Sequence, residues 1–324
     1  MDLVKRPRRL RTDERIRSLV REQRLTREQL VYPLFVREGN GAPTPVPSMP
    51  GICQYPLEHL TSALSEVVAC AVPAVLFFGI PLHKDAMGTR AYAEDGIVQQ
   101  ALRVAKDRFP ELYLIGDVCL CEYTDHGHCG LVSDGQVLND ESVELLARAA
   151  VAQAESGADM VAPSDMMDGR VGAIRRALDQ AGFEQTPIMS YAAKFASAFY
   201  GPFRQAANSA PQFGDRLSYQ LDPANGDEAM RDTALDVAEG ADVILVKPAM
   251  AYGDIIYRTK QSYGLPVAAY NVSGEYAMVK AAAAAGWIDE RRVVLEALLG
   301  MRRAGADILV TYHALDASCW LQEP

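Results

Sequence analysis

Strand-like and helix-like segments alternate along most of this 324-residue chain. Short runs rich in valine, isoleucine and leucine predict strands, and the amphipathic stretches between them predict helices. The predicted strands are Ala74–Gly79, Leu112–Cys119, Met160–Pro163, Pro187–Ala192, Leu217–Leu221, Val243–Lys247, Pro266–Asn271 and Asp307–Tyr312. The predicted helices are Leu57–Ala71, Asp95–Arg108, Asp140–Ser156, Arg170–Ala181, Asp227–Glu239, Tyr252–Tyr263, Glu275–Ala285 and Asp289–Gly305. Eight β-then-α units in about 250 residues favour an α/β fold, a parallel (β/α)₈ barrel of the TIM type.

An open, doubly wound sheet is the alternative fold. It normally carries a glycine-rich, phosphate-binding turn after its first strand, and the sequence Phe77-Phe-Gly-Ile-Pro81 is not such a turn. We therefore expect a catalytic barrel over residues 31–324 and an N-terminal arm over residues 1–30, with Val31–Val36 as a short extended segment. In such a barrel, functional side chains gather at the carboxyl ends of the strands.

Three cysteines follow the second predicted strand. Cys119, Cys121 and Cys129 lie within eleven positions, and a Cys-x-Cys pair in extended chain points both side chains to one side. Thiolates are soft ligands that suit Zn²⁺, and three of them leave one coordination position open for water or substrate. This spacing predicts a catalytic zinc site.

A structural zinc site is the alternative, with His126 or His128 as the fourth ligand, and the spacing alone leaves it open. A disulfide is less favoured, because six cysteines in 324 residues are too few for a disulfide-stabilised scaffold. The other three cysteines, Cys53, Cys70 and Cys319, are scattered, and we interpret them as ordinary buried or surface residues.

Two lysines end predicted strands or follow them closely. Lys247 ends the apolar run Val-Ile-Leu-Val-Lys, and Lys194 follows Tyr191-Ala-Ala. Burial disfavours the ammonium form and a second lysine nearby lowers the pKa further, so we expect neutral amines able to form Schiff bases with ketones. The alternative is that each lysine pairs with a carboxylate such as Asp117 or Asp165. Two such lysines beside a candidate zinc site favour chemistry.

The long segment Phe195–Leu217 predicts a lid over the site, because it contains two glycines and two prolines. Its Arg204 and Arg216 suit bidentate contacts with a substrate carboxylate, although any single arginine is more often a solvated surface residue. Ser273 and Tyr312 are neutral donors that suit a second carboxylate. Asp117 and Asp165 are candidates for orienting amines or moving protons.

Charge is distributed unevenly along the chain. The net charge is −10, whereas residues 1–30 contain ten lysines and arginines and five acids. A basic arm can bind nucleic acid, but no aromatic residues are interleaved with these arginines, so docking on a neighbouring subunit is favoured. No apolar run approaches the length of a membrane span and no signal-peptide core is present, so we expect a cytoplasmic protein without a membrane partner.

Several separate motifs, which together cover essentially the whole chain, resemble the porphobilinogen synthase (5-aminolevulinate dehydratase) family. They are Asp117-Val-Cys-Leu-Cys with Cys129, Ala162-Pro-Ser-Asp-Met-Met-Asp-Gly, Ser190-Tyr-Ala-Ala-Lys194 with Gly201-Pro-Phe-Arg204, Val246-Lys-Pro-Ala249, and Tyr270-Asn-Val-Ser-Gly-Glu-Tyr276. The resemblance implies a lyase of tetrapyrrole (heme, chlorophyll and cobalamin) biosynthesis. Such an enzyme condenses two molecules of 5-aminolevulinate into porphobilinogen with loss of two waters.

By this resemblance, Lys247 holds the first substrate (the P side) and Lys194 the second (the A side) as Schiff bases. Ser273 and Tyr312 would bind the P-side carboxylate. The A-side carboxylate would be bound by Arg204, Arg216 and Gln220. The pocket for the substrate amines would be lined by Asp117 and Asp165.

The resemblance also implies metals and an assembly. Because all three cysteines are present, the chain resembles the zinc-dependent type, with the metal beside the A-side amine. Many bacterial members bind an allosteric Mg²⁺ through a glutamate whose position here is occupied by Asp232, and Leu217 stands where the family often has lysine. Members assemble as homo-octamers of dimers that embrace through N-terminal arms, a role that Met1–Gln29 would fill.

Two other functions are weighed against this one. A lysine aldolase on the same barrel needs one Schiff-base lysine and no thiolate zinc, so the cysteines argue against it. A non-catalytic redox or metal-sensing module would use Cys119–Cys129 but leaves both lysines and the lid arginines without a purpose.

Overall fold

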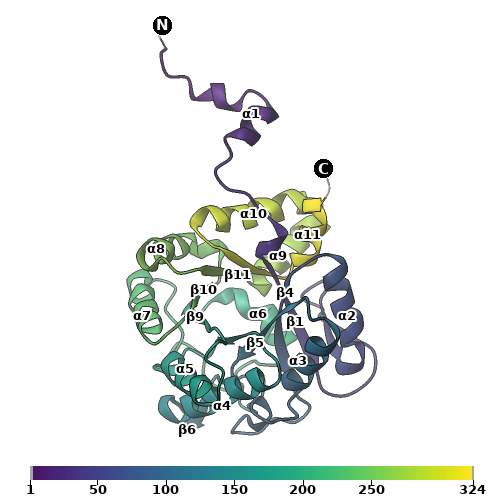
Figure 1. The fold of residues 1–324 in the computed structure, drawn as a ribbon, viewed down its shortest axis with the longest axis vertical. Coiled ribbons are helices and arrows are strands. Elements are labelled where there is room, and N and C mark those ends of the chain that lie inside the picture. Colours follow the sequence, from purple (N-terminus) through teal and green to yellow (C-terminus); the bar gives the residue numbers. More distant parts are fainter. Residues whose placement is uncertain (1–2, 323–324) are drawn as a thin grey trace.

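The computed structural model describes residues 3–322 as a barrel of eight parallel strands surrounded by helices, with an N-terminal arm extending away from it (Figure 1). The barrel strands are β1 (Leu30–Arg37), β4 (Ala74–Ile80), β5 (Tyr113–Val118), β8 (Met160–Pro163), β9 (Met189–Lys194), β10 (Val243–Lys247), β11 (Val267–Asn271) and β12 (Ile308–Thr311). They lie in the order β8-β5-β4-β1-β12-β11-β10-β9, and a parallel bridge from Val161 to Ile188 closes β8 onto β9. The predicted (β/α)₈ barrel is confirmed.

The barrel strands are continuous apolar runs rather than alternating ones. Every residue of β4, β9, β10 and β11 is buried, because side chains fill the barrel on one face and helices cover the other. The outer helices are amphipathic. In α3, for example, Ile97, Ala101 and Ala105 are buried, whereas Lys106 and Arg108 are not.

Each predicted helix is present with its ends shifted by a few residues at most. The long helices are α2 (Leu57–Ala69), α3 (Ile97–Arg108), α4 (Asn139–Glu155), α5 (Arg170–Gln180), α7 (Gly226–Ala238), α8 (Gly253–Tyr263), α9 (Ser273–Ala284) and α10 (Glu290–Ala304). A last helix, α11 (Ala314–Gln322), follows β12 and was not predicted. None of the helices in residues 3–322 combines the length and the hydropathy needed to cross a membrane.

One predicted strand is wrong, and a different segment takes its place in the barrel. Leu217–Leu221 forms a turn in which the Gln220 N–H donates to the Arg216 carbonyl, and a single bridge from Leu221 to Phe195 is all that joins it to a strand end. The first barrel strand is instead β1, which pairs with β4 and β12. Pro33 in its middle is uncommon in a central strand, since it lacks an N–H, and this weakened the strand signal.

Two small hairpins and a short helix lie in the loops that connect the barrel strands to the helices. β2 (Thr44–Pro45) pairs with β3 (Cys53–Pro56) beside β1, and β6 (Leu131–Ser133) pairs with β7 (Gln136–Leu138) after the cysteine loop. The short helix α6 (Gly201–Ala206) lies in the predicted lid.

The N-terminal arm consists of short helical turns exposed to solvent. Its elements are η1 (Pro7–Arg11), α1 (Glu14–Leu19) and η2 (Arg27–Gln29). Asp13 caps α1 by accepting hydrogen bonds from the N–H groups of Arg15 and Ile16. Figure 1 shows this arm projecting from the barrel near α10 and α11.

Candidate active site

Both candidate lysines lie where strands end at the mouth of the barrel. Lys194 is the last residue of β9, Lys247 is the last residue of β10, and the two are paired across the sheet. Their Nζ atoms lie 5.6 and 5.2 Å from the centre of the Tyr191 ring, and each lysine is 4% exposed. The fold therefore brings the two amines into one buried space.

Aromatic rings surround the amine of Lys247. Its Nζ lies 4.4 Å from the ring centre of Tyr270, 4.9 Å from that of Phe203 and 5.4 Å from that of Tyr200. Burial lowers the pKa of Lys247 to about 7, and the positive charge of Lys194 adds to this effect. About half of the Lys247 side chains are therefore neutral near pH 7, as a nucleophilic amine requires.

Lys194 behaves differently from the expectation. Its Nζ donates a hydrogen bond to the carbonyl of Ser164. Burial lowers its pKa, but negative charge on Cys129 and the other two thiols outweighs burial, so the pKa of Lys194 is raised. The prediction of two lowered pKa values is correct for Lys247 and wrong for Lys194. Among residues 3–322, neither lysine forms an ion pair with a carboxylate, which disfavours the simple pairing alternative.

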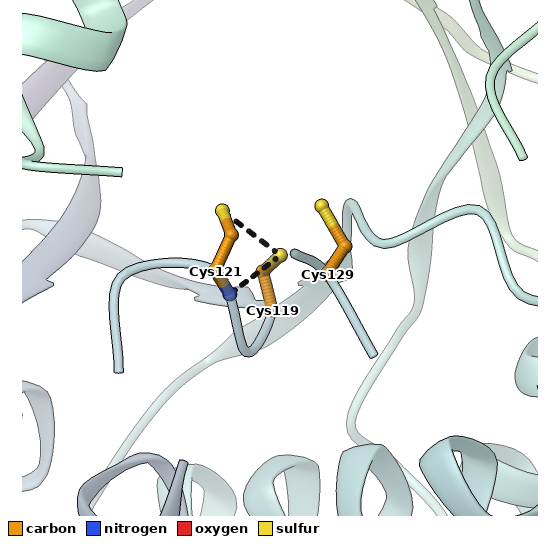
Figure 2. A group of neighbouring side chains, drawn as sticks. All are labelled: Cys119, Cys121 and Cys129. Carbon is orange, nitrogen blue, oxygen red and sulfur yellow. Dashed lines mark hydrogen bonds between the residues drawn. The ribbon is translucent and has the colours of Figure 1, made fainter. Parts of the chain in front are cut away.

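The three cysteines converge from two stretches of chain (Figure 2). The Sγ atoms of Cys119 and Cys121 are 3.4 Å apart, all three Sγ atoms lie within 4.8 Å of one another, and all three residues are buried. Sulfurs bound to one tetrahedral zinc would be about 3.8 Å apart, given Zn–S bonds of about 2.3 Å. The donor set therefore fits a zinc ion with a free coordination position.

Neither nearby histidine belongs to this group of ligand atoms. The ring nitrogens of His128 lie 3.1 Å from the Tyr219 hydroxyl and 3.1 Å from the Phe213 carbonyl. The Nδ1 atom of His126 accepts a hydrogen bond from the His128 N–H. Both imidazoles are thus used to hold the loop and the lid, which disfavours the closed structural zinc site.

The two candidate aspartates have different surroundings. Asp117 is the next-to-last residue of β5 and accepts a hydrogen bond of 3.1 Å from the Ser164 hydroxyl. Burial raises its pKa to about 8, with Glu122 adding to the rise. Asp165 is fully buried and its Oδ2 lies 3.8 Å from Nε of Arg170; burial raises its pKa to about 6. The fold places Asp165 in the Arg170 cluster and Asp117 closer to the two lysines.

The predicted lid covers a small pocket that contains both lysines. Its lining includes Lys194, Lys247, Cys121, Ser164, Arg204 and Arg216. The Nη2 atom of Arg216 donates to the carbonyls of Gly127 and Ser209, at 2.9 and 2.6 Å, which fixes the guanidinium.

Three side chains in the lid or just after it keep buried polar atoms without a protein partner in residues 3–322. These atoms are Nε of Arg204, Nε of Arg216 and both amide atoms of Gln220. Gln220 lines the adjoining groove rather than the lysine pocket itself. Buried donors without partners are costly, so such a group indicates a place for a hydrogen-bonding ligand.

Ser273 and Tyr312 each contact a residue whose ring faces the amine of Lys247. The Tyr312 hydroxyl is 3.0 Å from that of Tyr270, whose ring faces Lys247. The Ser273 hydroxyl accepts a 2.9 Å hydrogen bond from the N–H of Phe203, another ring of the cage. These two hydroxyls lie on the Lys247 side of the site, as their predicted role requires.

Comparison with known proteins identifies the family. A sequence model described as "Delta-aminolevulinic acid dehydratase" matches residues 4–320. The chain belongs to the delta-aminolevulinic acid dehydratase family. It is 57% identical to the delta-aminolevulinic acid dehydratase of Halalkalibacterium halodurans, over 98% of this chain and 97% of that one. The Bacillus subtilis protein of the same name is 56% identical, with 98% of each chain covered.

A solved member of the dehydratase family has the same fold. The Toxoplasma gondii protein, in complex with the reaction product porphobilinogen, superposes with a TM-score of 0.96 at 43% identity, covering 98% of this chain and 92% of that one. At this similarity the whole barrel, and not only its class, is shared.

The position suggested for magnesium in this dehydratase lies outside the pocket. Asp232 is in α7 and lines a surface groove with Asp168 and Glu228. Within residues 3–322 it belongs to no group of three ligand atoms that lie close enough to share an ion. Burial raises the pKa of Asp232, and the nearby carboxylate of Glu228 adds to the rise. A magnesium ion at Asp232 stays a prediction.

Several residues of the site were missed by sequence reasoning. The aromatic cage consists of Tyr191, Tyr200, Phe203 and Tyr270. Glu122, which lines the pocket with its Oε2 3.2 Å from the Cys121 sulfur, was also missed. All five stand inside the quoted motifs or directly beside one of them, so their closeness in sequence to the quoted motifs was the available signal.

Proposed function

We propose that this protein is a porphobilinogen synthase that condenses two 5-aminolevulinate molecules into porphobilinogen. The observation that carries the proposal is a pair of buried amines, Lys194 and Lys247, in one pocket beside three convergent thiols. Two ketones need two amines, and four hydrogens and two oxygens leave as two waters. The names of the relatives support the same reaction.

Lys247 would act on the first substrate. Its neutral amine attacks the keto carbon, a C–N bond forms, and the carbonyl oxygen leaves as water to give a Schiff base. Asp117, with a pKa of about 8, is mostly protonated at neutral pH and suits the donation of a proton to that oxygen. Ser273 and Tyr312 would hold the carboxylate of this substrate.

Lys194 would hold the second substrate in the same way, with its carboxylate bound by Arg204, Arg216 and Gln220. The support for this anion site is the set of buried guanidinium and amide atoms that have no partner in residues 3–322. Asp165 would contribute to the amine pocket through its negative charge. Both lysines return to free amines when the product leaves.

The metal that we propose for Cys119, Cys121 and Cys129 is zinc. When bound, it would offset the negative charge of the sulfurs and supply a Lewis acid next to the second substrate. With that charge offset, burial would lower the pKa of Lys194 as it does that of Lys247.

The assembly and setting are proposals of the same kind. Residues 1–30 would form an oligomerisation arm and residues 31–324 the catalytic barrel of a homo-octamer. The support is that Val4, Leu10 and Leu19 of the arm are 83%, 52% and 78% exposed in the single chain. A reducing cytoplasm suits an enzyme with three metal-binding thiols, and Asp232 is the candidate for an allosteric magnesium ion.

Reduction with borohydride in the presence of 5-aminolevulinate tests the reaction. We expect peptide mass spectrometry to find the reduced adduct on Lys247 and, at saturating substrate, on Lys194. Lys247→Met should lose both the adduct at that position and turnover, whereas the exposed-lysine control Lys106→Met should keep both. An adduct on neither lysine would refute the proposal.

A further inference from the structure

A second pair of thiols lies close together, away from the candidate active site. Cys70 caps the end of α2 and Cys319 lies in α11, 249 residues later, yet their Sγ atoms are 3.4 Å apart. Both were interpreted from the sequence as isolated, ordinary cysteines. The two sulfurs need to approach by about 1.4 Å to reach the S–S bond length of about 2.05 Å.

Hydrogen bonds from α11 to the residue that follows α2 hold the two cysteines in this position. The Ser318 hydroxyl donates to the Cys70 carbonyl at 2.5 Å, and the Gln322 side chain donates to the same carbonyl at 3.4 Å. These hydrogen bonds join the backbone at one cysteine to residues on either side of the other. The closeness of the thiols therefore follows from the backbone position that these hydrogen bonds fix, and not from one side-chain rotamer alone.

The pair lies at the opposite end of the barrel from the lysines. Helix α2 ends just before β4 begins at Ala74, so Cys70 is at the amino end of the strands. Lys194 and Lys247 are at the carboxyl ends. Chemistry at Cys70 and Cys319 can thus proceed without contact with the substrate pocket.

We propose that Cys70 and Cys319 are a modification site that forms an intramolecular disulfide by exchange with a small-molecule disulfide such as oxidised glutathione. The bond would link the last helix, α11, to α2. It would close a loop of about 250 residues, and such long loops restrict the unfolded chain most.

The exchange takes two balanced steps. Cys319, which is exposed, attacks the small disulfide as a thiolate, and one glutathione thiolate leaves. Cys70 then attacks the sulfur of Cys319 in the mixed disulfide, and the second glutathione leaves. The reagent gains two electrons, and the two protons lost by the cysteines go to the two glutathione thiolates.

The surroundings assign the order of these steps. Burial raises the pKa of Cys70 to about 12, and the neighbouring thiol of Cys319 contributes to that rise, so Cys70 is a poor first nucleophile. Once Cys319 is in the mixed disulfide, it has no thiol left to raise the pKa of Cys70. Because Glu66 and Asp316 also disfavour the thiolate, the pair suits slow equilibration with a thiol–disulfide buffer.

The test uses the full-length protein with its metal, equilibrated with oxidised and reduced glutathione and then alkylated. We expect peptide mapping without reductant to show one peptide joining Cys70 to Cys319, on a band of monomer size. Tm should rise by roughly 5 °C relative to the reduced protein and return after dithiothreitol. The zinc content and initial rate should stay unchanged, because Cys119, Cys121 and Cys129 do not take part.

Three single variants provide the controls. Cys319→Ser and Cys70→Ser should each lose the joined peptide and the Tm rise, whereas Cys53→Ser should keep both. If Cys70→Ser fails to fold, Cys319→Ser at the exposed position decides the matter. The proposal is overturned if oxidation leaves Cys319 only glutathionylated, joins two chains instead of one, or raises the Tm of Cys319→Ser by the same amount.

Discussion

The amine of Lys247 experiences two opposing effects. Aromatic ring faces attract a cation, and four ring centres lie between 4.4 and 5.4 Å from its Nζ. Removal from water and the charge of Lys194 favour the neutral form. Burial is the largest cause of the fall of this pKa to about 7, and the charge of Lys194 is the next. The cage thus keeps the amine dry and available for attack.

This balance predicts the pH dependence of catalysis. Below pH 7 the neutral fraction of Lys247 falls about tenfold per pH unit, so kcat/KM should fall in proportion and level off above pH 7. The measurement is kcat/KM from pH 5.5 to 9 at constant ionic strength, with borohydride capture on Lys247 at each pH. A profile that keeps rising about tenfold per pH unit up to pH 9, as for a solvated lysine, would contradict the assignment.

The three thiols predict the effect of removing one metal ligand. Cys121→Ser should lower the zinc content from about one ion per chain to a small fraction, because a hydroxyl is a poor ligand for this soft-donor site. Metal analysis after exhaustive dialysis measures this directly, and turnover should fall in parallel. The matched control is Cys53→Ser, a cysteine outside the cluster. Full zinc content in Cys121→Ser, or full activity after chelation, would exclude the proposed site.

The lid is held by loops from several parts of the barrel. The Gln54 side chain donates to the Ala206 carbonyl at 2.7 Å, and the Lys84 Nζ donates to the Asn208 carbonyl at 2.6 Å. The Gln212 N–H donates to the His126 carbonyl at 3.0 Å. These contacts tie the lid to β3, to the loop after β4 and to the cysteine loop, so lid position and metal-loop position are coupled.

Helix α5 is fixed by a buried charge cluster beneath the same site. Arg170, 4% exposed, donates to Asp236 of α7 at 3.0 Å and to the Ser190 hydroxyl and the Tyr191 carbonyl of β9 at 3.2 and 3.3 Å. The cluster joins two helices to the strand that ends at Lys194. Loss of the Arg170 guanidinium would leave the carboxylates of Asp165 and Asp236 buried without a charged partner.

This cluster predicts a large effect on stability. Arg170→Met should lower the free energy of unfolding by about 3–5 kcal/mol, because Asp236 and Asp165 would be left buried and uncompensated. Urea unfolding followed by circular dichroism measures the change. Arg176→Met, at an exposed position on the same helix, should change it by less than about 0.5 kcal/mol. Equal effects for the two variants would show that the cluster adds no stability.

At the scale of the whole molecule, the arm leaves the barrel and packs little on it. The 3–10 and α-helical elements of residues 7–19 have no buried side chain, and the arm exposes apolar side chains, among them Val4 and Leu19. Exposed apolar side chains on a projecting segment are typical of an interface between subunits.

The arm predicts how assembly depends on the N-terminus. Removing residues 1–29 should convert the full-length oligomer into smaller species, since β1 begins at Leu30 and the barrel remains complete. Sedimentation velocity measures the mass of both proteins. Leu19→Asp should weaken assembly in the same direction, whereas the exposed arm control Arg15→Gln should not. An unchanged oligomer after the deletion would refute the role of the arm.

The sequence alone determined the barrel class and the chemical groups of the site. Both follow from local features: the alternation of strand and helix patterns, and short motifs that carry Lys194, Lys247 and the three cysteines. The side-chain types that suit amine and metal chemistry are visible without any knowledge of how distant segments meet.

The tertiary structure decided which segments close the barrel and how the site is aligned. The register between β9 and β10 shifts by one residue, because Ser190 pairs with Ile244 whereas Ala193 pairs with Val246. This bulge places one extra residue on β9, which lets the side chains of Tyr191 and Lys194 lie on the same side of the strand. Strand choice at β1, the exclusion of both histidines from the thiol group, and the meeting of Cys70 with Cys319 were decided in the same way. Each depends on pairing and packing between distant segments, which local sequence patterns do not encode.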